Sequence, residues 1–148
     1  MKKITALLLA LMLSFTLILL PSCGEDETTD STESTAADPW DSATYKENTT
    51  LGTGAKTFTL QVCAYDKTVS FTVKTDKETV GEALSELNLI EGEDSAYGLY
   101  IKKVNGILAD YDVDQTYWAV YINGEYAMSG IDTTNVENGA TYKLSREK

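Results

Sequence analysis

Residues 56–74, KTFTLQVCAYDKTVSFTVK, contain the pattern that decides the fold. Apolar side chains alternate with polar ones from Phe58 to Ala64, and again from Val69 to Val73. Alternation with a period of two is typical of strands that bury one face and expose the other. The stretch therefore predicts a β-hairpin with one apolar and one polar face.

The register of this hairpin follows from its turn. A two-residue turn at Asp66 and Lys67 predicts Val62 opposite Phe71, and it puts every apolar residue on one face. Cys63 then falls among polar neighbours on the other face. Because the chain has no histidine to act as its base, we do not expect Cys63 to be a catalytic nucleophile.

A helix is predicted directly after the hairpin. Thr79-Val80-Gly81-Glu82 matches a capping box, in which a threonine and a glutamate satisfy each other's backbone N–H groups. Apolar residues then recur at helical spacing, which indicates an amphipathic helix of about three turns: Val80, Ala83, Leu84 and Leu87. The helix is expected to end between residues 88 and 93.

The rest of the chain reads as further strands. They are expected at 97–107, 117–122, 125–129 and 141–144, with Asn-Gly pairs at 105–106, 123–124 and 138–139 as turn signals. A hairpin, one helix and further strands predict an α+β fold of β-grasp type, a mixed or antiparallel sheet of hairpins with the helix packed across it. An all-β sandwich is the alternative if the helix is shorter.

The stretch 116–130, TYWAVYINGEYAMSG, is the principal candidate for a binding site. A turn at Asn123-Gly124 pairs Tyr121 with Tyr126 and makes both faces of this hairpin largely apolar. One face can pack on the helix, but the other needs a cover: the loop 108–116, the segment around Trp40, a partner chain or a ligand. The candidate binding residues are Tyr117, Trp118, Tyr121, Tyr126 and Met128, together with Tyr97.

A second and incomplete candidate is a calcium site at Asp110, Asp112 and Asp114. Alternating aspartates begin the EF-hand loop, which supplies the oxygens that Ca²⁺ prefers. The pattern then departs from that loop, because Gln115 stands where it needs glycine and Tyr121 where it needs glutamate. A polar loop without a metal is the preferred interpretation.

The N-terminus resembles a bacterial lipoprotein signal. A basic start and the apolar run 4–20 lead into Leu20-Pro21-Ser22-Cys23, which is similar to a lipobox. We therefore expect residues 1–22 to be a signal peptide and Cys23 to carry acyl chains that hold the protein on the outer side of the bacterial cell membrane. A retained transmembrane anchor is the alternative interpretation, since the run is just long enough to span a bilayer.

Composition separates a linker from a domain. Residues 23–54 are acidic and rich in serine and threonine, so they predict a flexible linker, whereas residues 55–148 have periodic apolar residues and predict one folded domain. Trp40 is the exception in the linker. It could dock on the domain, lie at the membrane interface or be solvated.

Charge and composition exclude several functions. The formal net charge of −11 disfavours binding to nucleic acid, because phosphates repel an acidic chain. The absence of histidine and the lack of a phosphate-binding loop argue against an enzyme. We therefore expect a non-catalytic binding module that requires no cofactor, or a surface module for protein–protein interaction.

Several motifs together resemble the transcobalamin-like C-terminal domain found in bacterial surface lipoproteins, often as a domain of unknown function. They are Thr79 to Leu84, Tyr97-Gly98, Val104-Asn105-Gly106, Tyr117-Trp118, Asn123-Gly124-Glu125, Gly130 and Asn138-Gly139. The resemblance covers residues 56–146 and implies a β-grasp fold and a corrinoid-like ligand. In animal vitamin B12 carriers a helical domain forms the other wall of the cleft. The resemblance thus implies a second protein that completes the site.

Overall fold

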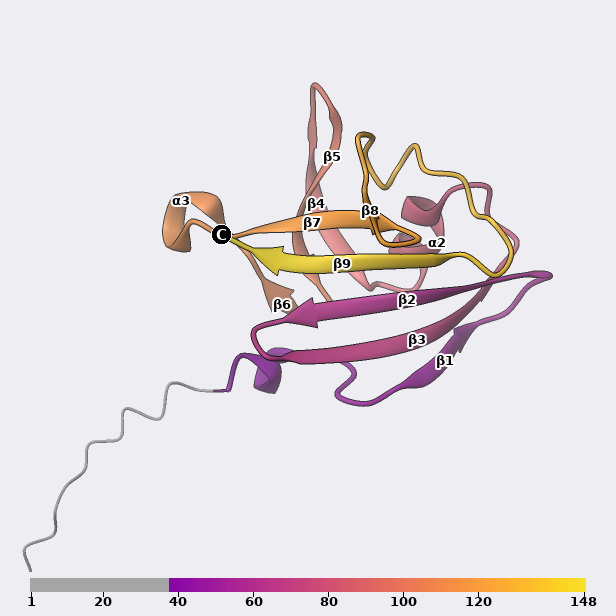
Figure 1. Cartoon of the computed structure of the whole chain (residues 1–148), viewed down its shortest axis with the longest axis horizontal. Coiled ribbons are helices and arrows are strands. Elements are labelled where there is room, and N and C mark those ends of the chain that lie inside the picture. The colour runs from indigo at the N-terminus through magenta and orange to yellow at the C-terminus, as the bar shows by residue number, and fades with distance from the viewer. Residues whose placement is uncertain (1–37) are drawn as a thin grey trace, which may run out of the picture. The chain divides into compact units, whose positions relative to one another are not determined.

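The computed structural model describes residues 38–148, so the predicted signal peptide and Cys23 lie outside the described residues. Figure 1 shows two sheets with short helices beside them. This sheet-rich architecture with few helices is consistent with the predicted α+β class. The helical elements are η1 (Pro39–Ser42), α2 (Val80–Glu86) and α3 (Tyr111–Asp114). The strands are β1 (Thr49–Gly52), β2 (Lys56–Ala64), β3 (Lys67–Thr75), β4 (Ile90–Ser95), β5 (Gly98–Val104), β6 (Ile107–Leu108), β7 (Tyr117–Ile122), β8 (Glu125–Tyr126) and β9 (Thr141–Glu147).

The larger sheet has six strands in the order β1-β3-β2-β9-β7-β8. The last strand, β9, lies in its middle, parallel to β2 and antiparallel to β7. At the edge, β1 runs parallel to β3. The sheet is therefore mixed, and β9 joins the first hairpin to the β7–β8 hairpin, which carries the candidate site.

The β2–β3 hairpin forms as predicted, but its register is shifted. Its turn is at Tyr65 and Asp66, so Val62 pairs with Val69 instead of Phe71. Tyr65 adopts a positive φ of 55°, as a tight two-residue turn requires. Each residue of β2 thus pairs with a residue two positions away from the predicted partner on β3. Because side chains alternate between the two faces with a period of two, a shift of two positions leaves every side chain on its predicted face. The apolar face was consequently predicted correctly despite the wrong turn.

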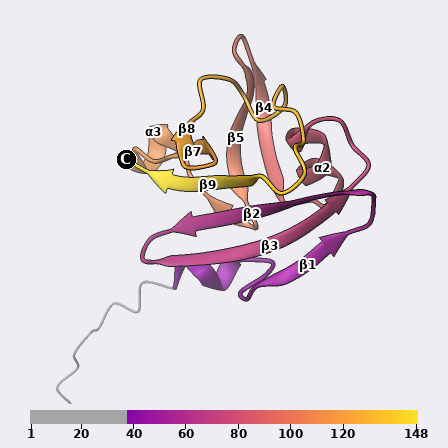
Figure 2. The same ribbon diagram turned by 45° about the vertical axis from the view of Figure 1, so that its right-hand side comes forward.

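The two faces of the six-stranded sheet differ in burial. On one face, side chains such as Leu60, Phe71 and Leu144 are fully buried. They form one core with residues of α2, β5 and β6, and Figures 1 and 2 show α2, β4 and β5 on that side of the sheet. The opposite face carries mostly half-buried or exposed polar residues, among them Thr59, Gln61 and Thr72. This open face reaches β7 and β8.

Helix α2 begins at the predicted capping box. The Thr79 hydroxyl accepts a hydrogen bond from the Glu82 N–H (3.3 Å), and the Glu82 carboxylate accepts one from the Thr79 N–H (3.5 Å). The helix is shorter than predicted, because Asn88 has a positive φ of 53° and Leu89 N–H turns back to the Leu84 carbonyl. Within residues 38–148, no helix has the length and hydropathy needed to cross a membrane.

The smaller sheet, β4-β5-β6, contains a strand that the sequence did not predict. Residues 90–95, IEGEDS, are acidic and include a glycine, which gives them low strand propensity. They nevertheless pair with β5 along their length, with a bulge at Glu91 and Gly92. Pairing with a neighbouring strand therefore outweighs local propensity here. The turn at Asn105-Gly106 forms between β5 and β6, as predicted.

The N-terminal part of the described chain corrects the predicted linker boundary. Residues 39–52 are not a linker: they form η1 and β1 and pack on the domain. Trp40 is 3% exposed, and its indole N–H donates to the Ala64 carbonyl at 3.0 Å. The buried Asn105 side chain bonds the backbone N–H and carbonyl of Tyr45. Trp40, these contacts and the pairing of β1 with β3 hold this otherwise polar segment on the domain.

Candidate functional site

The β7–β8 hairpin forms around the predicted turn. Asn123 and Gly124 have φ values of 50° and 90°, the left-handed geometry of a two-residue hairpin turn. Tyr121 pairs with Tyr126 in the predicted register, and their rings meet edge to face with centroids 5.5 Å apart. The strand β8 ends at Tyr126, although the sequence predicted it to reach residue 129. The turn therefore joins two tyrosines into one aromatic pair.

Two charged residues of β9 hold the Tyr121 ring. The Lys143 Nζ lies 4.0 Å from the ring centroid, and the Tyr121 hydroxyl donates a hydrogen bond to Glu147 Oε1 at 2.8 Å. This hydrogen bond, together with partial desolvation and the carboxylate charge, raises the pKa of Tyr121 above its ordinary value. Tyr121 is therefore a neutral hydrogen-bond donor at physiological pH. Lys143 contacts its ring and Glu147 binds its hydroxyl.

Tyr117 extends the same face. It is half-buried and stands opposite Glu147 in the β7–β9 register. Burial, and then the Glu147 charge, raises the pKa of Tyr117. Between the two tyrosines of β7, the small side chain of Ala119 is fully covered. We call Tyr117, Tyr121 and Tyr126 the tyrosine face.

The tyrosine face belongs to the open side of the sheet. Tyr126 is 54% exposed. The loop 108–116, one of the predicted covers, lies instead against the other side: Arg146, which stands opposite Trp118, donates a hydrogen bond to the Leu108 carbonyl at 3.0 Å. The segment around Trp40 also packs into the core, under β2 and β3. Neither segment shields Tyr126 from solvent.

Trp118, which the sequence-based list includes, lies on the other face of β7 from the tyrosines. Its side chain points to the core face and is only 6% exposed. The indole N–H is buried without a hydrogen-bond partner among the described residues. The predicted pairing at Asn123-Gly124 puts Trp118 on the opposite face from the tyrosines, but because both faces are apolar, the sequence does not show which one is buried. The elements that cover Trp118 come from distant parts of the chain.

Met128 and Tyr97 lie on two neighbouring loops. Met128 is 96% exposed after β8, and Tyr97 is 94% exposed at the β4–β5 turn. The turn and the loop meet closely, since a side chain built on Gly130 would approach the Tyr97 carbonyl to 3.5 Å. Figures 1 and 2 both show the β4–β5 hairpin projecting beside the loop that follows β8. We call Tyr97, Tyr126 and Met128 the rim.

A surface hollow lies next to the rim. Its volume is about 570 Å³, and its lining residues come from the end of β7, the turn, β8 and the loop beyond: Ile122, Asn123, Glu125, Tyr126, Ala127, Met128 and Glu137. Apolar side chains, an amide and two carboxylates thus border one depression. A depression of this size is within the range of small-ligand sites.

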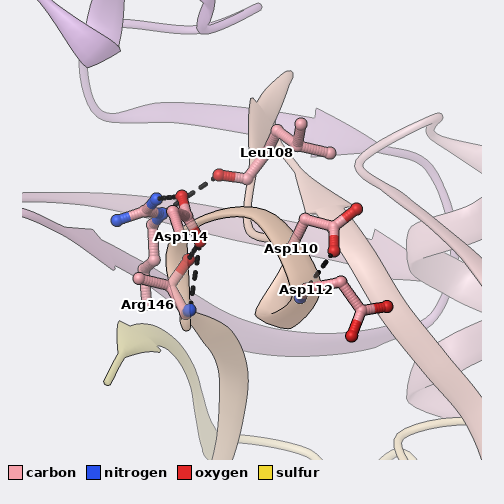
Figure 3. A network of polar contacts seen from close by, with 6 residues as sticks. Leu108, Asp110, Asp112, Asp114 and Arg146 are labelled. Carbon is pink, nitrogen blue, oxygen red and sulfur yellow. Dashed lines mark hydrogen bonds and ion pairs between the residues drawn. The ribbon is translucent and has the colours of Figure 1, made fainter.

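The aspartates of the calcium candidate form contacts with other protein groups. Figure 3 shows that Asp114 pairs with Arg146, while Asp110 accepts a hydrogen bond from the Asp112 N–H at 3.0 Å. Asp114 also accepts from the Thr116 hydroxyl, and this bond is the main cause of its lowered pKa. Across residues 38–148, no group of three or more acidic or cysteine side chains could hold a metal ion. Asp110 caps α3, and Asp114 pairs with Arg146.

Sequence reasoning missed the residues that hold the tyrosine face. Lys143 and Glu147 reach Tyr121 only because β9 pairs with β7 in the observed register. Their alternation in the last strand shows that they share a face, but the neighbouring strand is not visible from local sequence. Asp132 was also missed, and one of its carboxylate oxygens is buried without a hydrogen-bond partner.

One family model matches part of the folded chain. Residues 77–142 match a domain of unknown function, DUF4430. The match begins before α2 and ends in β9, so it includes the tyrosine face, the rim and the hollow. It leaves out the β2–β3 hairpin.

A solved relative identifies the family. The chain is 33% identical to a "putative metal binding protein" from Ruminococcus gnavus, with a TM-score of 0.60 over 64% of this chain and 98% of that protein. The chain belongs to the family of this protein. Haptocorrin in complex with Cbi is also similar, at 21% identity and a TM-score of 0.49, over 66% of this chain and 26% of haptocorrin. No curated protein matched the sequence.

Proposed function

We propose that the protein is a non-catalytic binding module whose tyrosine face and rim contact a ligand outside the cytoplasm. One observation carries this proposal: two large side chains that line the hollow, Tyr126 and Met128, are 54% and 96% exposed. Tyr97, which is 94% exposed, lies on the neighbouring β4–β5 turn. Exposed apolar side chains that gather at one place, instead of lying scattered, mark interaction sites.

The chemistry of the site suggests the kind of ligand. Tyrosines offer an apolar ring and a polar hydroxyl, so they suit a ligand with a broad apolar surface and polar edges. A corrinoid fits this description and is the ligand implied by the family resemblance. The hollow forms only one wall, and burying both sides of such a ligand requires a second protein or domain.

Equilibrium dialysis with cobalamin tests this proposal. A soluble form that begins at Gly24 retains every residue the structure describes, and the visible absorbance of the corrin reports how much ligand is retained. Dialysis is preferable to fluorescence quenching, because Trp40 and Trp118 are both buried and far less accessible than the rim tyrosines. We expect saturable retention, and we expect Tyr126→Ser to weaken it at least tenfold.

Tyr111→Ser provides the matched control, since Tyr111 is exposed to a similar extent (58%) but lies on α3. It should bind as the unmodified protein does. Retention that does not saturate, or an equal loss in both variants, would refute the proposed ligand. Because the Ruminococcus gnavus relative is named for metal binding, the dialysis is run with and without divalent cations.

A protein partner is the second candidate. The tyrosine face lies on an open sheet surface, and tyrosine is enriched at the centres of protein–protein interfaces. Under this alternative, Tyr121→Ser with Tyr126→Ser abolishes capture of a surface protein, whereas cobalamin is not retained by any variant. An unchanged set of captured proteins would contradict it.

The anchoring and the finer fold description are further parts of the proposal. We propose that Cys23 is lipidated and holds the domain at the membrane; metabolic labelling with a palmitate analogue tests this, with Cys23→Ser as the negative control. We also propose a β-grasp fold of transcobalamin-like type. The hairpin β2–β3, the helix α2 and the placement of β9 parallel to β2 support that description.

A further inference from the structure

Asp132 lies where three elements meet. It belongs to the loop after β8, which is bonded to the first residues of α2: the Gly81 N–H donates to the Ile131 carbonyl at 2.9 Å, and the Val80 N–H to the Thr134 carbonyl at 2.8 Å. The third element is the β4–β5 turn, whose Gly98 lies beside the Asp132 carboxylate. Asp132 therefore lies at the seam between the loop and the turn that carry the rim.

One oxygen of this carboxylate lacks a partner. The Oδ1 atom of Asp132 is buried and accepts no hydrogen bond from the described residues. The ion pairs formed within residues 38–148 do not include Asp132 either. Burying a carboxylate oxygen without a hydrogen bond or a counter-ion is strongly unfavourable. Such an atom in a native structure calls for a bound water or ion.

Two glycines make room for the carboxylate. A Cβ atom built on Gly98 would lie 2.7 Å from Oδ1, and one built on Gly130 only 2.3 Å. Gly98 also has a φ of +102°, which side chains rarely adopt. Glycines therefore flank the carboxylate on both sides, although no group of the described residues donates a hydrogen bond to its buried oxygen.

A second oxygen lies nearby. A Cβ built on Gly130 would lie 2.3 Å from Oδ1 and 3.5 Å from the Tyr97 carbonyl oxygen, so these two oxygens are less than about 6 Å apart. A carboxylate and a backbone carbonyl are the ligand types of Ca²⁺, which tolerates irregular geometry and completes its shell with water. Mg²⁺ is less suitable, because it requires near-ideal octahedral geometry.

The geometry points to a weak site for a divalent cation, best suited to Ca²⁺, formed by the Asp132 carboxylate and the Tyr97 carbonyl. The cation neutralises the buried oxygen and joins the β4–β5 turn to the loop 127–133. It thereby fixes Tyr97 relative to Met128. The cation site does not depend on the proposed ligand, and with so few protein ligands its Kd is expected at about 10⁻⁴–10⁻³ M.

Calcium titration of the ¹⁵N-labelled soluble form, followed by NMR at constant ionic strength, tests this inference. We expect saturable shifts of the Tyr97, Gly98 and Gly130 amides. In Asp132→Asn these shifts should be at least tenfold weaker at the same CaCl₂ concentration. Asp112→Asn is the control, since its carboxylate is exposed and distant from the seam, and it should titrate as the unmodified protein does.

Several outcomes would overturn the cation site. One is the absence of saturable shifts at these three amides up to about 10 mM CaCl₂, tenfold above the weakest expected Kd; this would leave a water as the partner of Oδ1. Another is an unchanged titration in Asp132→Asn. The NMR spectrum of each variant shows whether that variant is folded. The first outcome, the absence of saturable shifts, is measured on the unmodified protein and does not depend on any variant. Cobalamin dialysis in calcium-free buffer is a separate readout, so failure of one proposal leaves the other testable.

Discussion

The Tyr121 hydroxyl binds Glu147, although the residue opposite Glu147 in the sheet register is Tyr117. The contact is therefore diagonal. The Glu147 carboxylate accepts a hydrogen bond from Tyr121, and its charge also raises the pKa of Tyr117. Lys143, which is the register partner of Tyr121, covers the ring instead of the hydroxyl. The orientation of the tyrosine face depends on this short polar segment of β9.

Replacing Glu147 by glutamine should lower the pKa of Tyr121. The ionised carboxylate favours the neutral phenol, because it accepts the hydroxyl hydrogen and repels the tyrosinate. Glutamine still accepts the hydrogen bond but carries no charge. NMR titration of ring-labelled tyrosines in the Glu147→Gln variant and in the unmodified protein measures the change. An unchanged Tyr121 titration would show that Glu147 does not control this hydroxyl.

The same groups predict how stability changes at alkaline pH. Folding raises the pKa of Tyr117, Tyr121 and Tyr142, so the folded chain retains protons that the unfolded chain loses above about pH 10. Their stabilising effect is complete below that pH and is lost as pH rises through the folded values. Urea unfolding at pH 8 and pH 11 should show a smaller loss in Tyr121→Phe than in the unmodified protein.

Acid should weaken the cluster around Asp114. Hydrogen bonds from Thr116, together with the charge of Arg146, lower the pKa of Asp114 in the folded chain. Its contribution to stability is therefore present above the ordinary value near 4 and is lost as pH falls through the folded value. Asp114→Asn should lose less stability than the unmodified protein between pH 6 and pH 3. Asp112→Asn, as the control, should follow the unmodified protein.

The hairpins and their faces could be predicted from the sequence because their signals are local. Alternation from Phe58 to Ala64 indicates the buried face, and the Asn123-Gly124 pair indicates the turn that joins Tyr121 to Tyr126. Even the wrong turn at 66–67 left the buried face correct. Local patterns therefore identify the tyrosines of the candidate site and their common face.

The remaining features depend on contacts between distant segments. Trp118 lies in the core, where β5, a strand outside its own hairpin, contacts β7. Trp40 is buried by Ala64 and Lys67, more than twenty residues away. Lys143 reaches Tyr121 through strand pairing alone. Single-sequence patterns do not specify these pairings.

Trp40→Ala should destabilise the domain by about 3–5 kcal/mol, the usual range for removing a buried aromatic side chain. Trp40 is 3% exposed, its indole N–H donates to the Ala64 carbonyl, and Lys67 lies 4.8 Å from the centroid of its ring. Urea unfolding measures the loss, with Tyr111→Ala as an exposed aromatic control that should change stability by less than about 0.5 kcal/mol. Equal, small effects in both variants would mean that residues 38–52 do not contribute to the core.

Gly81→Ala should destabilise the domain, although alanine normally stabilises a helix relative to glycine by roughly 0.5–1 kcal/mol. The reason is steric: a Cβ on Gly81 would lie 2.6 Å from the Asp132 Cα and 3.1 Å from the Ile131 carbonyl oxygen. Both are backbone atoms of the loop bonded to α2, so they cannot rotate away as a side chain could. Overpacking of this kind typically costs about 1–3 kcal/mol, which exceeds the gain in helix propensity.

Urea unfolding of Gly81→Ala decides between the two effects, and Ser85→Ala on the exposed side of α2 provides the control. Ser85 faces solvent, so only propensity acts there, and that variant should be unchanged or slightly more stable. Calcium titration of Gly81→Ala adds a second readout. Displacing the Asp132 backbone should move the carboxylate away from the Tyr97 carbonyl and weaken the cation-dependent shifts. A Gly81→Ala variant more stable than the unmodified protein would show that the loop and the helix are not packed as closely as the structure places them.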